Sequence, residues 1–223
     1  MSEAFLCDGE RVEAAPGTTA AAGAVALALR ALVARLGTLA LAELDDVVMG
    51  LTDAVDGEVV AALGTVLPAG SAAVTVRRGT GSGLDVVAVA ARAIKSGEAD
   101  LVLAVIVPPG LPPVACALVL ASERGSLRHG LRPLARVVGT TIAPAVGRGA
   151  TTGAVERLLA RVGIWPQDVT VYHLDEGLGT PGAGHAHLLL GAARELVRRG
   201  GRYAVSATAL GEGQAIATLL ERA

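Results

Sequence analysis

A glycine-rich turn, Gly79-Thr80-Gly81-Ser82-Gly83, is the stretch of this 223-residue chain whose residue types best suit a reaction centre. The β-branched run Val74–Val76 precedes it and the apolar stretch Leu84–Lys95 follows it, which predicts a strand, a tight turn and a helix. Such a helix directs its first backbone N–H groups and the positive end of its dipole into the turn. The pattern is also typical of a plain strand–helix unit whose glycines only permit close packing.

Two hydroxyl side chains lie in this turn. Thr80 would act as a nucleophile only beside a base, because a hydroxyl is far less acidic than a thiol. Ser82 is expected to cap the helix. The helix itself is apolar on nearly every face, so we expect it to be buried, with Gly97 ending it before a second strand at Leu101–Val107.

Acid–base groups gather again in the last quarter of the chain. Asp175 and Glu176 follow a strand expected at Asp168–His173, and His185 opens a helix expected to end at Arg199. An imidazole beside a helix N-terminus tends to stay neutral and can accept or donate a proton. A neighbouring acid and His185 would form an acid–base pair. The alternatives are a solvated pair of loop carboxylates and a packed histidine without a function.

The turn and its helix resemble the nucleophile segment of thiolases, most closely β-ketoadipyl-CoA and acetyl-CoA acyltransferases. In those enzymes a cysteine stands immediately before an (Ala/Gly)-Ser-Gly-Leu run, and here Thr80 holds that place. The opening Ala4–Cys7, the run Asp46–Gly50 and the segment Gly130–Val138 also resemble thiolase framework motifs. The resemblance covers nearly the whole chain.

The resemblance also assigns roles near the end of the chain. His185 falls where thiolases have Gly-His-Pro, whose histidine activates the nucleophile and helps to hold the thioester oxygen, although Ala186 replaces the proline. Asp175 replaces the family's asparagine, which holds a water in an oxyanion hole. A carboxylate there would repel a developing oxyanion unless it were protonated. Glu176 matches the family residue as it stands.

The second catalytic cysteine of thiolases is missing as well. Ala209 stands in its place and cannot move protons. Gly211 is retained, and its N–H with that of residue 80 would form the family's second oxyanion hole, while Glu212 replaces a small or apolar residue. The proline-rich connector at residues 108–113 stands where thiolases insert a loop domain that covers the active site and binds coenzyme A.

These departures predict a thiolase-like protein without thiolase acyl transfer. It would act on, or bind, an acyl thioester linked to coenzyme A or to a carrier protein, using His185 and backbone oxyanion holes. If it is an enzyme, hydrolysis, decarboxylation or cyclisation is expected. The alternative is a pseudoenzyme, a structural or regulatory subunit that partners an intact thiolase-fold enzyme.

Composition limits the other classes of function. The net charge of −2 and the 2% of aromatic residues argue against nucleic-acid binding. The longest apolar stretch is interrupted by Arg30 and Arg35, so no membrane span is expected, and no leader peptide is predicted. Cys7 and Cys116 lie in apolar runs and are expected to be buried, free and inert, as in a cytoplasmic protein. No metal or cofactor is expected.

An internal repeat predicts the architecture. Ala90-Ala91-Arg92 aligns with Ala192-Ala193-Arg194, each inside a buried helix that follows a glycine-rich turn. We expect an α/β fold of the layered αβαβα type, built from two similar halves at residues 1–122 and 123–223. The resemblance implies dimerisation through the strand at Ala73–Arg77, as a homodimer or as a heterodimer with a thiolase-fold relative.

Overall fold

A computed structural model describes residues 2–14, 21–37, 42–51, 56–68, 71, 73–77, 82–107, 113–144, 149–175, 185–211 and 213–223. The first half of the chain comprises these elements: β1 (Phe5–Glu13), α1 (Ala21–Leu36), β2 (Asp46–Leu51), α3 (Asp56–Gly64), β3 (Ala73–Val76), α4 (Ser82–Ser96), β4 (Leu101–Val107) and β5 (Val114–Ala121). The second half comprises α5 (Glu123–Arg128), β6 (Ala135–Pro144), α6 (Ala150–Val162), a 3₁₀ turn at Pro166–Asp168, β7 (Val169–Asp175), α7 (His185–Arg199), β8 (Tyr203–Gly211) and β9 (Gln214–Arg222).

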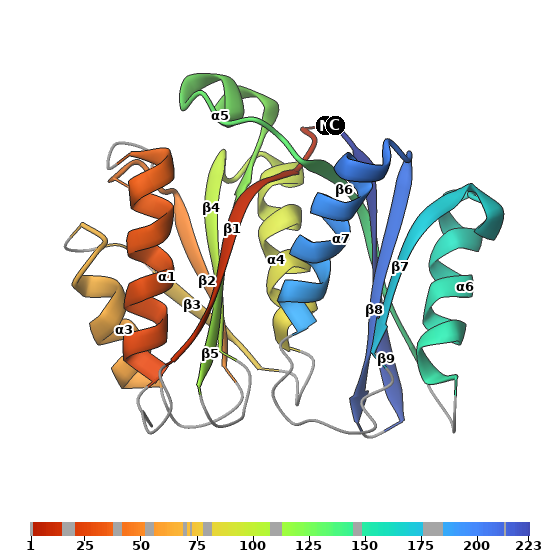
Figure 1. Cartoon of the computed structure of the whole chain (residues 1–223), viewed down its shortest axis with the longest axis horizontal. Coiled ribbons are helices and arrows are strands. Elements are labelled where there is room, and N and C mark those ends of the chain that lie inside the picture. The colour runs from red at the N-terminus through yellow and green to blue at the C-terminus, as the bar shows by residue number, and fades with distance from the viewer. Residues whose placement is uncertain are drawn as a thin grey trace.

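The described strands form one nine-stranded sheet in the order β3-β2-β4-β5-β1-β6-β9-β8-β7. The two halves of the sheet are joined only where β1 meets β6, through the residue pairs Phe5–Arg136 and Leu6–Ala135. Because this joint is so short, the halves separate beyond it and leave room for helices between them (Figure 1). The sheet therefore behaves as two sheets that share a seam.

The second half repeats the strand order of the first. The order β2-β4-β5-β1 is reproduced as β7-β8-β9-β6, with one parallel pair followed by two antiparallel pairs in each case. Each first strand also carries a bulge, between Leu6 and Asp8 in β1 and between Val137 and Gly139 in β6. This matches the repeat seen in the sequence and confirms the prediction of two similar halves.

Helices occupy three layers around these sheets. α1 and α3 pack on the outer side of the first half, α6 packs on the outer side of the second, and α4 and α7 lie side by side between the halves (Figure 1). The central apolar cluster draws residues from α4, α7 and both halves of the sheet, including Leu84, Val102, Leu189 and Ala204. The layered αβαβα fold expected from the sequence is thus the observed one.

The burial of α4 follows from its sequence. Leu84, Val87 and Ile94 have no exposed surface, and Gly97 ends the helix with a φ of +84° that favours glycine. The boundary expected between residues 122 and 123 stays a prediction, since the halves share this central core.

Some element boundaries differ from the sequence-based expectation. β1 continues past Cys7 to Glu13, because the bulge is confined to Cys7 and pairing with β5 resumes at Asp8 and Gly9. β6 begins at Ala135 rather than Gly130, which has a φ of +62° outside any strand. The short helix α5, capped by the Ser122 hydroxyl that accepts a hydrogen bond from the Gly125 N–H, was not expected.

Candidate functional site

The parallel strands and the two central helices converge on one edge of the molecule. β2, β3 and β4 run parallel and end at this edge, as do β7 and β8 in the second half. α4 follows β3 and α7 follows β7, so both helices begin at the same edge, at the lower side of Figure 1. Ligands of open α/β sheets bind at the carboxyl ends of parallel strands. This edge is therefore the candidate active site.

Apolar packing brings the two helix N-termini together. α4 and α7 are in contact, and Leu84 and Leu189, each close to the start of its helix, are fully buried in the same cluster. Two parallel helix dipoles that begin at one edge raise the positive potential there. The arrangement favours an oxyanion or another anionic group between the helix starts.

The predicted site residues map onto this edge. His185 is the first residue of α7, Ser82 is the first residue of α4, and Gly211 is the last residue of β8. Asp175 ends β7 and is paired in register with Thr208 of β8. Thr80, Glu176 and Glu212 lie outside the described residues. The topology thus gathers four predicted positions from four separate elements.

Asp85 is a buried acid at this edge that the sequence reasoning did not single out. It lies in the first turn of α4 and is only 4% exposed. The signal was present in the sequence, because Ser82 followed three residues later by an acid matches the capping-box pattern. A carboxylate here stabilises the helix start through the dipole and adds an acid to the candidate site.

Neither cysteine of the chain is positioned to act as a thiolate at this edge. Burial raises the pKa of Cys7 to about 11, against a smaller lowering by its hydrogen bond with Ser126. Burial also raises the pKa of Cys116 to about 12. Both cysteines are free and buried, as expected from the sequence. Ala209, the residue in place of the family's second cysteine, lies within β8 opposite Ala215.

The histidine of β7 has a structural role. His173 Nε2 lies 2.8 Å from Glu195 Oε2 of α7, and its Nδ1 lies 3.1 Å from the Leu188 carbonyl oxygen. The hydrogen bond from His173 is the main cause that holds the pKa of Glu195 below its usual value. The pair ties α7 to β7 and thereby fixes where the helix begins.

No three side chains of His, Cys, Asp or Glu within the described residues lie close enough together to hold a metal ion. No helix within the same ranges is long and apolar enough to cross a membrane.

Comparison with known proteins gives sequence relatives over part of the chain. No protein-family model matches it. The 3-oxoadipyl-CoA/3-oxo-5,6-dehydrosuberyl-CoA thiolase of Escherichia coli K12 is 38% identical over 141 residues, covering 48% of this chain and 35% of the relative. The bovine mitochondrial 3-ketoacyl-CoA thiolase is 29% identical over 147 residues, covering 50% and 36%. The chain thus spans about a third of the length of these curated relatives.

Solved structures extend the likeness to the whole fold. Two structures of human mitochondrial 3-ketoacyl-CoA thiolase, one of them in complex with CoA, each superpose on this chain with a TM-score of 0.80. The sequence identity is 17%, and the CoA complex is covered over 100% of this chain and 98% of that chain. The chain therefore has the fold of a thiolase throughout, and about half of its sequence is similar to that of CoA thiolases.

Proposed function

We propose that the chain binds or acts on an acyl thioester, linked to coenzyme A or to a carrier protein, without carrying out thiolase acyl transfer. The observation that carries the proposal is the pair of contacting helices, α4 and α7, that begin at the edge where the parallel strands end. Their starts include Ser82 and His185, and such paired helix N-termini suit the oxygen of a thioester. The curated relatives are named as CoA thiolases, which supports the same substrate class.

Acyl transfer is disfavoured by the side chains at this edge. Transfer through a covalent intermediate needs an activated nucleophile, and condensation needs a second base. Threonine and alanine stand at positions 80 and 209, and both cysteines are buried with raised pKa values. Hydrolysis, decarboxylation or cyclisation assisted by His185 needs neither thiolate. We therefore propose a repurposed acyl-thioester enzyme, located in the cytoplasm as the free cysteines favour.

Hydrolysis of acetyl-CoA tests the proposal, with release of the coenzyme A thiol as the readout. The His185→Ala variant is expected to lose about 10²- to 10⁴-fold in turnover, because it removes the imidazole that would act as base or donor. His129→Gln serves as the matched control, since His129 caps α5 away from the helix starts. Equal turnover in His185→Ala and the unmodified chain would exclude a catalytic role for His185.

A non-catalytic partner role is the second candidate. It is favoured by β3, the end strand of the described sheet, whose Val74 is 46% exposed. An exposed strand edge can pair with the same edge of another thiolase-fold subunit. Co-purification with an intact thiolase, together with acetyl-CoA turnover that is absent in the unmodified chain, would favour this role over catalysis.

A further inference from the structure

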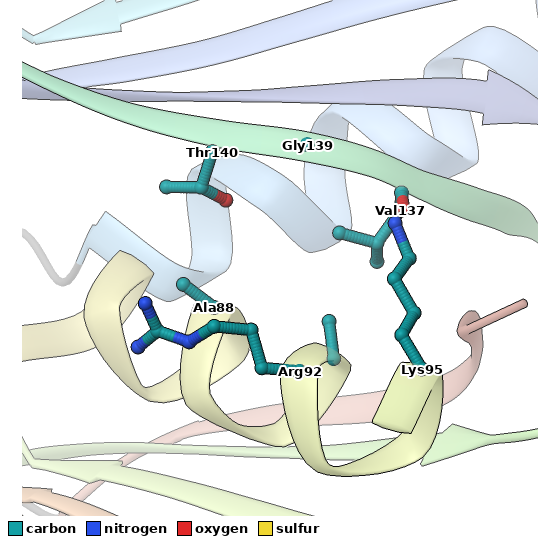
Figure 2. A pocket seen from close by; sticks show the side chains of 7 residues that line it. Ala88, Arg92, Lys95, Val137, Gly139 and Thr140 are labelled. Carbon is teal, nitrogen blue, oxygen red and sulfur yellow. Dashed lines mark hydrogen bonds between the residues drawn. The ribbon is translucent and has the colours of Figure 1, made fainter. Parts of the chain in front are cut away.

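A hollow between α4 and β6 lies apart from the candidate active site. Its volume is about 90 Å³, and these residues line it: Ala88, Ala91, Arg92, Lys95, Val137, Gly139 and Thr140. The helix residues come from the middle and the last turns of α4, away from the helix start (Figure 2). This volume is below the usual range for small-molecule sites, so the hollow suits a compact group such as a carboxylate.

Both charged residues that line the hollow are cations. Lys95 Nζ donates to the carbonyl oxygens of Val137 at 2.6 Å and Val138 at 2.9 Å. The exposed Arg92 makes no hydrogen bond or ion pair with any residue in the described ranges, and its side chain extends from α4 beside Thr140 (Figure 2). The nearby carboxylates of Glu3 and Glu221 are bound by Arg136. Burial lowers the pKa of Lys95, and a bound anion would oppose that change.

The internal repeat provides the equivalent arrangement in a filled form, between α7 and β1. The repeat places Arg194 of α7 where Arg92 lies in α4, and the matching bulges place Gly9 of β1 where Thr140 lies in β6. Arg194 donates to the Gly9 carbonyl oxygen at 2.7 Å and lies 3.8 Å from Asp8 Oδ1. Beside β1, then, the carboxylate of Asp8 accompanies the helix residue Arg194.

The outer helices confirm this equivalence. Arg35, next to the last residue of α1, donates to the Gly9 carbonyl oxygen at 3.1 Å. Arg161, next to the last residue of α6, donates to the Thr140 carbonyl oxygen at 2.7 Å. Each strand carbonyl thus receives an arginine from the outer helix of its own half.

The acidic residues of β1 do not recur in β6. Arg35 is bound by Asp8 at 3.0 Å and by Glu10 at 2.6 Å. Counting from the bulge, the positions of Asp8 and Glu10 are taken in β6 by Gly139 and Thr141. Beside β6, therefore, Arg92 and Arg161 are kept without an accompanying carboxylate among the described residues, although the hollow leaves space for one.

We propose that this hollow is a binding site for a small carboxylic acid, whose carboxylate lies against Arg92 and Lys95 where the first half uses Asp8. A carboxylate matches the guanidinium fork through charge-assisted hydrogen bonds. Gly139 lines the hollow without adding a side chain to it. The site is independent of the proposed acyl-thioester activity.

Calorimetric titration of the full chain with succinate, at constant ionic strength, tests the proposal. The unmodified chain is expected to bind succinate at one site. Arg92→Gln is expected to weaken binding by at least about tenfold, without loss of fold because Arg92 makes no bond to the described residues. Arg30→Gln, an exposed arginine on the outer helix α1, is the matched control and should bind as the unmodified chain does.

A second variant places a carboxylate of the chain itself on β6. A Cβ at Gly139 would lie 3.3 Å from Arg161 Nη2, the flexible end of a side chain, so Gly139→Asp can be accommodated. Its carboxylate restores the acid of the first half and is expected to weaken succinate binding about tenfold as well. The proposal is overturned by absence of binding to the unmodified chain, by unchanged affinity in either variant, or by binding of inorganic phosphate but not of succinate.

Discussion

At the residue scale, the reactivity of the two cysteines tests directly whether their thiols are buried. Cys7 and Cys116, with pKa values of about 11 and 12, are the chain's only thiols. At pH 8 only about one Cys7 thiol in a thousand would be ionised. We expect no reaction with Ellman's reagent in the folded protein and two thiols per chain after unfolding in urea. Fast modification of one thiol under native conditions would contradict the burial of that cysteine.

Glu221 links acid stability to the β6–β9 pairing. Burial alone would raise the pKa of Glu221, but hydrogen bonds from Arg136 and Arg202 lower it on balance from 4.5. A lowered folded pKa gives stability above the unfolded pKa, and this is lost as pH falls below about 4.5 through the folded value.

Glu221→Gln is therefore expected to lower the free energy of unfolding at pH 7 by about 1–2 kcal/mol and to weaken its fall below pH 4.5. Urea unfolding across pH 3 to 7 measures both effects, with Glu98→Gln on the exposed turn after α4 as control. A pH profile unchanged by Glu221→Gln would show that the ion pairs contribute nothing.

Sequence reasoning reached some residues of the candidate site and missed others. His185 and Asp175 were singled out by their places in thiolase-like motifs beside elements with clear periodicity, and both lie at the candidate edge. Asp85 was missed because an acid in an otherwise apolar helix was taken as part of the helix pattern. The place of Arg92 in the hollow depends on the distant strand β6, so no local sequence pattern reveals it.

At the element scale, two helical glycines have opposite roles. A Cβ on Gly125 of α5 would lie 2.4 Å from the backbone oxygen of Asp100, whereas a Cβ on Gly23 of α1 would meet nothing within 4 Å. Gly125→Ala is expected to lower the free energy of unfolding by about 1–3 kcal/mol, because backbone must move. Gly23→Ala should raise it by about 0.5–1 kcal/mol, because alanine favours the helix.

Urea unfolding of the two variants measures this difference in sign. A stabilising effect of Gly125→Ala would mean that α5 does not pack against Asp100 in solution. The sequence did not predict α5 because the helix is short. Its six residues, Glu123–Arg128, are too few for a periodic pattern, and only Ser122 as a cap marked its start.

Most other elements were predicted within a few residues, since apolar runs such as Leu101–Val107 and the helix His185–Arg199 carry strong patterns. The failures occurred where tertiary contacts override local signals. Gly9, which resembles a turn residue, continues β1 because it pairs with Leu118 of β5. Leu134 N–H donates to the Leu6 carbonyl oxygen at 2.8 Å before β6 begins, a contact that spans the whole first half.

At the scale of the whole molecule, the exposed edge of β3 predicts association. We expect a dimer through this strand, because it ends the described sheet and presents Val74 at 46% exposure. Val74→Glu should give monomers, since paired edges would bring two carboxylates together. Light scattering after size-exclusion chromatography measures the mass.

Trp165→Glu is the matched control for this prediction. Trp165 is 68% exposed before the 3₁₀ turn in the second half, so its replacement should leave the mass unchanged. A monomeric unmodified chain, or a dimer that persists in Val74→Glu, would contradict association through β3. Loss of the dimer in Trp165→Glu would place the interface on the other half.

The shared layer of α4 and α7 has a consequence for how this protein holds together. One half taken alone would leave a helix with protein on only one side, because the opposite sheet supplies its other cover. Two separate copies could meet that need only by associating, and association weakens on dilution. Joining the halves in a single polypeptide makes that mutual shielding intramolecular, so the integrity of the central layer does not depend on protein concentration.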